Sequence, residues 1–73
     1  MELIQLVETI KQVDSWIDHE LEQIKKAEEL HNLGIYTKET KDREINSHKL
    51  RLSNLTRLKD VYESQLGKYK LED

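Results

Sequence analysis

Apolar residues recur every seven positions on both sides of a glycine-containing segment, and this repeat constrains the fold more than any other feature of the sequence. Counted in heptads lettered a to g, the first segment has a positions Leu3, Ile10, Ile17, Ile24 and His31, and d positions Leu6, Val13, Glu20 and Ala27. Such a repeat is typical of a long helix that buries one apolar stripe.

The second segment repeats the pattern. Its a positions are Ile45, Leu52, Lys59 and Leu66, and its d positions are His48, Leu55, Tyr62 and Tyr69. When the two segments are laid antiparallel, a positions of one face d positions of the other, and the numbers of facing residues always add up to 72, as for Ile17 with Leu55. The chain must therefore reverse near residue 36, which predicts an antiparallel helical hairpin.

The predicted fold class is all-α, with a coiled-coil-like two-helix hairpin as a single domain over residues 1–73. We expect the first helix at about 2–33, the turn at 34–37 and the second helix at about 38–70. The sequence has no proline and two glycines, so it offers few places for the repeated turns of a β-sheet.

The predicted turn contains residues suited to ending one helix and starting another. Gly34 can take the left-handed conformation that terminates a helix. Thr37 is a suitable N-cap, and Glu39 lies where the dipole of the second helix favours a negative charge. The series Gly34, Ile35, Thr37 and a following acidic residue also resembles the turn of the short bacterial oligomerisation domains called SHOCT.

Composition limits the function classes. The chain of 73 residues has no cysteine and is 37% charged, which excludes disulfide, zinc-thiolate and thiol-nucleophile chemistry. It contains no apolar stretch of the roughly 18 residues that a membrane-spanning helix needs. The first residues also lack the basic and small-residue pattern of a signal peptide. We expect a cytoplasmic protein without a membrane partner.

Polar residues interrupt the predicted core rows, among them Glu20, Lys59 and His48. Glu20 lies opposite Leu52, and Lys59 lies opposite Val13. Long charged side chains there can reach water from a narrow interface, or fix the helix register at some cost in stability. His48 lies close enough to Glu20 for a hydrogen bond, which would make it either a satisfied core histidine or a pH switch.

Glu28 and His31 form an E-x-x-H motif near the turn, with Asp42 and Glu44 across the hairpin. Di-iron bundles use two such motifs and two further glutamates, whereas this chain has one among 15 acidic residues. It also lacks a nucleophile–base–orienter set and a glycine-rich phosphate loop. We therefore predict no metal, no cofactor, no catalytic residues and no small-molecule substrate.

A single hairpin buries one narrow stripe per helix, so the apolar residues beside that stripe predict a contact with another chain. Trp16, Leu58 and Val61 stand on one flank, and Val7 and Leu21 extend the apolar width on the other. Two alternatives follow: a homodimer that forms a four-helix bundle, and docking onto a different protein with Trp16 as the anchor. The two are compatible.

A nucleic-acid partner is the alternative from another class. The candidate contacts are Lys49, Arg51 and Arg57 in the second segment. The organisation is similar in shape to the plasmid copy-number regulator Rop, a dimeric hairpin bundle that binds paired RNA loops, although no contact residue can be matched. The first 33 residues carry eight acids and three bases, a charge that would repel phosphate. RNA or DNA binding is therefore the less favoured prediction.

The organisation as helix, glycine-containing turn and helix, with apolar flanks left over, also resembles the co-chaperones of type III secretion. That resemblance implies a small adaptor that pairs with a helical-repeat chaperone to hold a needle subunit. It rests on the organisation of the whole chain rather than on a signature motif. We expect an adaptor, inhibitor or co-chaperone that acts by binding.

Overall fold

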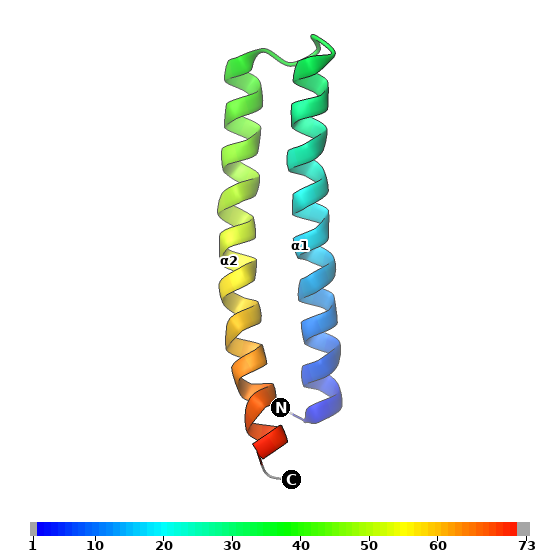
Figure 1. Ribbon diagram of the computed structural model, residues 1–73, viewed down its shortest axis with the longest axis vertical. Coiled ribbons are helices and arrows are strands. Elements are labelled where there is room, and N and C mark those ends of the chain that lie inside the picture. The colour runs from blue at the N-terminus through cyan, green and yellow to red at the C-terminus, as the bar shows by residue number, and fades with distance from the viewer. Residues whose placement is uncertain (1, 72–73) are drawn as a thin grey trace.

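The computed structural model describes residues 2–71, with the backbone alone for residues 70 and 71. It consists of two helices, α1 (Leu3–Asn32) and α2 (Lys38–Leu71). They run antiparallel beside each other, so that the start of α1 and the end of α2 lie opposite the turn (Figure 1). The predicted all-α hairpin is confirmed, as an elongated molecule of 55 × 15 × 15 Å.

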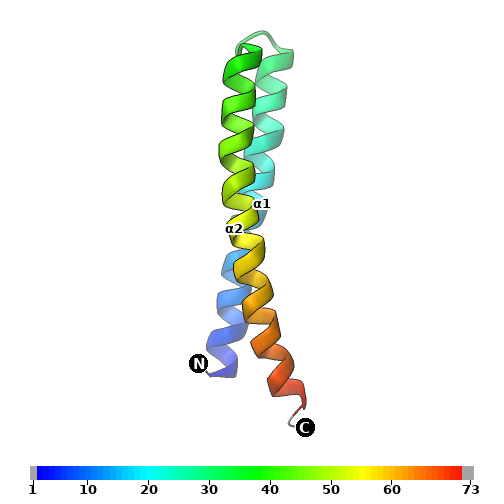
Figure 2. The same ribbon diagram turned by 90° about the vertical axis from the view of Figure 1, so that its left-hand side faces the viewer.

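The helices are not straight parallel cylinders. Figure 2 shows that they lie over each other near the turn and cross along their length, so that their other ends diverge. Crossing at a small angle is the geometry in which side-chain ridges of one helix fit between those of its neighbour. The heptad repeat therefore determines both the contact and its twist.

The turn forms as the local sequence predicts. Gly34 has a φ of 79°, in the left-handed region that a glycine adopts at little cost. Its amide donates to the carbonyl of His31 at 3.0 Å, and the amide of Ile35 donates to the carbonyl of Leu30 at 2.9 Å. This pair of hydrogen bonds is the Schellman motif, which satisfies carbonyls at the end of α1 that would otherwise lack partners.

Thr37 caps the start of α2 as predicted. The amide of Thr40 donates to Thr37 Oγ1 at 3.1 Å, the hydrogen bond expected of an N-cap residue. The Thr37 hydroxyl in turn donates to Thr40 Oγ1 at 3.0 Å. Glu39 lies in the first turn of α2, where the positive end of the helix dipole stabilises a carboxylate.

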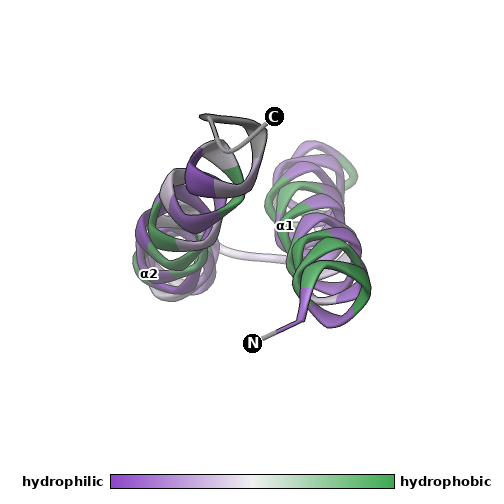
Figure 3. Ribbon diagram, turned by 90° about the horizontal axis from the view of Figure 1, so that it is seen from below, coloured by the Kyte–Doolittle hydropathy of each residue, from purple (hydrophilic) through white to green (hydrophobic). Residues whose placement is uncertain are grey.

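The buried core is a single row of α1. Among the described residues the buried side chains are Leu6, Val13, Glu20 and Ala27, the complete d row of the first segment. The α1 a row is half-buried from Ile10 onward, while Leu3 is exposed. Both core rows of α2 are half-buried wherever side chains are described. Figure 3 shows that hydrophobic parts of α1 also lie away from α2.

Candidate interaction surface

Large apolar side chains remain exposed along the whole hairpin. Those of the described residues are Leu3, Ile4, Trp16, Leu21, Leu33, Ile35, Leu50, Leu58 and Val61. Single exposed apolar residues are common on soluble proteins, whereas contiguous groups mark interaction surfaces. Exposed apolar residues that share a face of the hairpin are therefore the candidates for an interaction surface.

The heptad positions divide the apolar residues between two faces. In an antiparallel pair, the g and c positions of both helices border one side of the interface, and the a and e positions border the other side. Trp16 and Leu58 occupy g positions and Val61 a c position, so we call these three residues the Trp16 flank. Their side chains are 48%, 38% and 51% exposed, respectively.

The opposite side is the isoleucine flank. It consists of the α1 residues Leu3, Val7, Ile10, Ile17, Leu21 and Ile24, and of the α2 residues Ile45, Leu52 and Leu66. Leu21 is 49% exposed, and Val7 is half-buried. The five predicted contact residues therefore lie on two flanks rather than on one surface, with Val7 and Leu21 separated from the other three by the buried d row.

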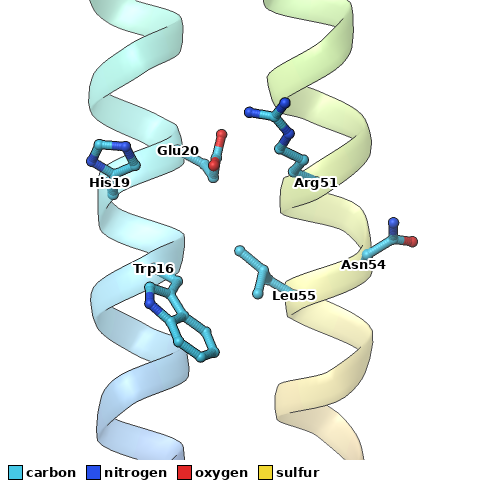
Figure 4. Close-up of a pocket in the computed structure, with 6 residues that line it drawn as sticks. All are labelled: Trp16, His19, Glu20, Arg51, Asn54 and Leu55. Carbon is cyan, nitrogen blue, oxygen red and sulfur yellow. The ribbon is translucent and has the colours of Figure 1, made fainter.

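A shallow groove follows the Trp16 side of the hairpin. It has a volume of about 330 Å³ and is lined by Trp16, His19 and Glu20 of α1 and by Arg51, Asn54 and Leu55 of α2. Every one of these residues occupies a c, d or g position. In Figure 4, the side chains of Trp16 and Leu55 extend between the helices, and Arg51 points toward Glu20 above them. The groove is thus lined by the apolar side chains of Trp16 and Leu55 together with polar groups that include Arg51 and Glu20.

The predicted hydrogen bond between Glu20 and His48 is present. His48 Nδ1 donates to Glu20 Oε2 at 2.5 Å, which assigns the proton to Nδ1 because a carboxylate can only accept. His48 Nε2 lies 3.9 Å from Glu44 Oε2. The pair satisfies two polar groups in the core and links the d rows of the two helices. Its use as a pH switch stays a prediction.

Lys59 forms an ion pair that the heptad pattern does not reveal. Its Nζ lies 2.6 Å from Asp14 Oδ1 of α1 and 3.6 Å from Glu63 Oε1. The hydrogen bond to Asp14 raises the pKa of the Lys59 amine above its ordinary value, and the charges of both carboxylates act in the same direction. Lys59 thereby reaches the edge of the isoleucine flank, while Val13 stays buried.

The E-x-x-H motif has a structural role in the turn. His31 Nδ1 lies 3.1 Å from the carbonyl oxygen of Tyr36, and donating to it ties the end of α1 to the residue before Thr37. Glu28 is exposed. Within residues 2–71, no group of three histidine, aspartate or glutamate side chains could hold a metal ion.

The candidate nucleic-acid contacts are exposed, but they do not form one stripe. Lys49, Arg51 and Arg57 all lie on the surface of α2. Successive residues of a helix are about 100° apart. Arg51 therefore projects about 160° away from Lys49, and Arg57 projects about 80° from Lys49 on the other side and about 120° from Arg51. A phosphate backbone following one face of α2 could therefore contact only part of this set.

Comparisons with protein-family models, curated proteins and solved structures found no match. The function of this chain is therefore inferred from its own geometry alone. Neither helix of the described residues is long and apolar enough to cross a membrane.

Proposed function

We propose that this protein is a non-enzymatic interaction module that binds a partner protein through the Trp16 flank. The observation that carries the proposal is the exposure of Trp16, Leu58 and Val61 beside an open groove. Tryptophan is frequent at binding hot spots because it offers a large contact area with few rotatable bonds. An adaptor, inhibitor or co-chaperone would use such a surface.

The groove suggests the chemistry of the partner segment. It runs along two helices, and its lining includes the apolar side chains of Trp16 and Leu55 together with Arg51. An amphipathic helix that offers apolar residues to Trp16 and Leu55 and an acidic residue to Arg51 would fit. The resemblance to type III secretion co-chaperones is one form of the same proposal, with a helical needle subunit or chaperone as the partner.

The test is affinity purification with this chain of 73 residues from the cells that make it, followed by binding measurements with the purified partner. Trp16→Ala should weaken binding by at least about 2 kcal/mol, or roughly 30-fold. Leu50→Ala is the matched control, because Leu50 is an apolar α2 residue that is 65% exposed and belongs to neither flank. Equal binding by the two variants would refute the role of the Trp16 flank.

Nucleic-acid binding through Lys49, Arg51 and Arg57 is the competing outcome of the same experiment. It would appear as affinity for RNA or DNA that falls steeply as the salt concentration rises, because bound phosphates release counterions. Trp16→Ala would then have little effect, whereas Arg51→Ala would reduce the salt dependence. The split directions of the three basic residues favour the protein partner.

A further inference from the structure

We infer that a second copy of this chain covers the isoleucine flank, forming a four-helix bundle whose two-fold axis runs along the hairpin, with each α1 packed against the α2 of its partner. This interface lies opposite the Trp16 flank. The inference is therefore independent of the proposed function, and the dimer would leave both copies of the Trp16 flank open to other proteins.

The accessible surface of the monomer is larger than its mass requires. It measures 5732 Å², whereas a compact protein of 8.7 kDa exposes about 4,700 Å². The excess of about 1,000 Å² is comparable to the roughly 800 Å² that each partner buries in a standard protein interface. The hairpin thus has enough surplus surface to form one stable dimer interface.

The isoleucine flank lies on the side of α1 where a four-helix bundle places the second neighbouring helix. The buried d row of α1 points toward α2. Measured around α1 from this row, the a row lies at about 50° and the e row at about 100°. Ile10, Ile17 and Ile24 occupy the a row, and Val7 and Leu21 the e row. Each helix of a four-helix bundle packs against two neighbours in directions separated by about this angle.

Charge selects the arrangement of the two copies. The residues of α1 include seven acids and three bases, for a net charge of −4, whereas those of α2 include five acids and nine bases, for a net charge of +4. A two-fold axis along the hairpin places each α1 beside an oppositely charged α2. An axis perpendicular to the hairpin would place α1 against α1 and α2 against α2, with repulsion at both contacts.

These requirements also favour a second copy over a different protein. The flank extends along the hairpin from Leu3 to Ile24 on α1 and from Ile45 to Leu66 on α2. A molecule that covers it must match its length and offer a basic helix to α1 and an acidic helix to α2. The chain itself meets all three conditions, and a two-fold interface needs only one such surface.

Sedimentation equilibrium at several concentrations tests the interface. The wild type should sediment with twice the chain mass of 8.7 kDa. Leu21→Lys should raise the dimer dissociation constant more than tenfold, because it places a charge in the buried apolar contact. Trp16→Lys is the matched control on the other flank and should leave the constant unchanged. Since Leu21 is half exposed in the hairpin, circular dichroism should show both variants helical.

Spin labels test the orientation. Because the chain has no cysteine, Ile35→Cys creates a single labelling site at the exposed turn. A two-fold axis along the hairpin puts the two turns at one end, about 10–15 Å apart, between one helix spacing and the diagonal of a four-helix bundle. A perpendicular axis would separate them by nearly the 55 Å length of the hairpin.

Three results would overturn the inference. They are a monomeric wild type at all concentrations, a dimer that Trp16→Lys breaks and Leu21→Lys does not, and a label separation close to the length of the hairpin. Partner binding that survives Trp16→Ala, with an intact dimer, would refute the proposed function alone. The two proposals can therefore fail separately.

Discussion

The two helices contribute unequally to the core that joins them. All four buried side chains, Leu6, Val13, Glu20 and Ala27, belong to α1, and among the side chains described for α2 none is buried to the same extent. The d row of α1 lies centrally between two rows of α2, each of which remains half-buried. One helix therefore inserts a single row, and the other surrounds it with two.

This asymmetry has an origin in the sequences of the helices. The a and d rows of α1 contain leucine, isoleucine, valine and alanine apart from Glu20 and His31, whereas the rows of α2 include Lys59, His48 and two tyrosines. The larger and more polar side chains of α2 keep their ends near water. We expect α1 to supply most of the contact energy and α2 to tolerate change.

The strongest test of this contrast is truncation of one leucine in each helix. Leu6 is fully buried, with no exposed surface, so Leu6→Ala should lower the free energy of unfolding by about 3 kcal/mol, within the range known for buried leucines. Leu55→Ala in α2 removes the same atoms from a half-buried site outside the isoleucine flank and should cost about half as much. Urea unfolding at one fixed chain concentration measures both, and equal losses would contradict the contrast.

The pair formed by Glu20 and His48 is the polar link between the helices. His48→Ala leaves the buried Glu20 carboxylate without its partner and should cost about 1–3 kcal/mol of unfolding free energy. Replacing both residues by leucine removes the polar groups together and should cost much less. A double-mutant cycle with Glu20→Leu and His48→Leu measures the coupling. Additive effects of the two substitutions would show that the hydrogen bond contributes little.

Much of this architecture could be predicted from the sequence. The two heptad series located the turn. The numbers of facing residues have a constant sum, and an antiparallel pair reverses at the single point that this sum defines. Gly34 and Thr37 indicated the ends of the helices, because left-handed termination and N-capping depend on single residues. The Glu20–His48 contact followed from the register alone.

Other features depend on information that the heptad pattern lacks. In α1 the a and d rows are both apolar, so the pattern treats them alike, and the packing against α2 decides that the row containing Leu6 and Val13 is central. Asp14 occupies an e position, and its contact with Lys59 depends on the reach of a flexible side chain. The separation of Trp16 from Leu21 does follow from their g and e positions, but the molecule that covers each flank is not encoded in the register.

The two glycines offer a sharper comparison between the turn and α2. Gly34 has a φ of 79°, so Gly34→Ala should cost about 1 kcal/mol of unfolding free energy through backbone strain. Gly67 lies within α2, and an added Cβ there would meet nothing within 4 Å. Gly67→Ala should therefore stabilise the hairpin by about 0.5 kcal/mol, because alanine favours the helix. Thermal unfolding followed by circular dichroism distinguishes the opposite signs, and the same sign for both would refute the prediction.

The ion pair of Lys59 with Asp14 should have the smallest effect on the unfolding free energy. The pH dependence of that effect has a defined sign. Its pKa in the folded hairpin is raised above the ordinary value of 10.5, chiefly by the hydrogen bond to Asp14, so the folded state holds this proton more tightly than the unfolded chain does. The resulting stabilisation is fully present below pH 10.5 and is lost as the pH rises through the folded pKa. The measured quantity is the difference in unfolding free energy between the wild type and Asp14→Asn. That difference should be small near neutral pH, since the ion pair is solvent-accessible, and it should shrink toward zero above pH 10.5. A difference that stays constant across this range would show that Asp14 acts through packing in α1 rather than through the charge of Lys59.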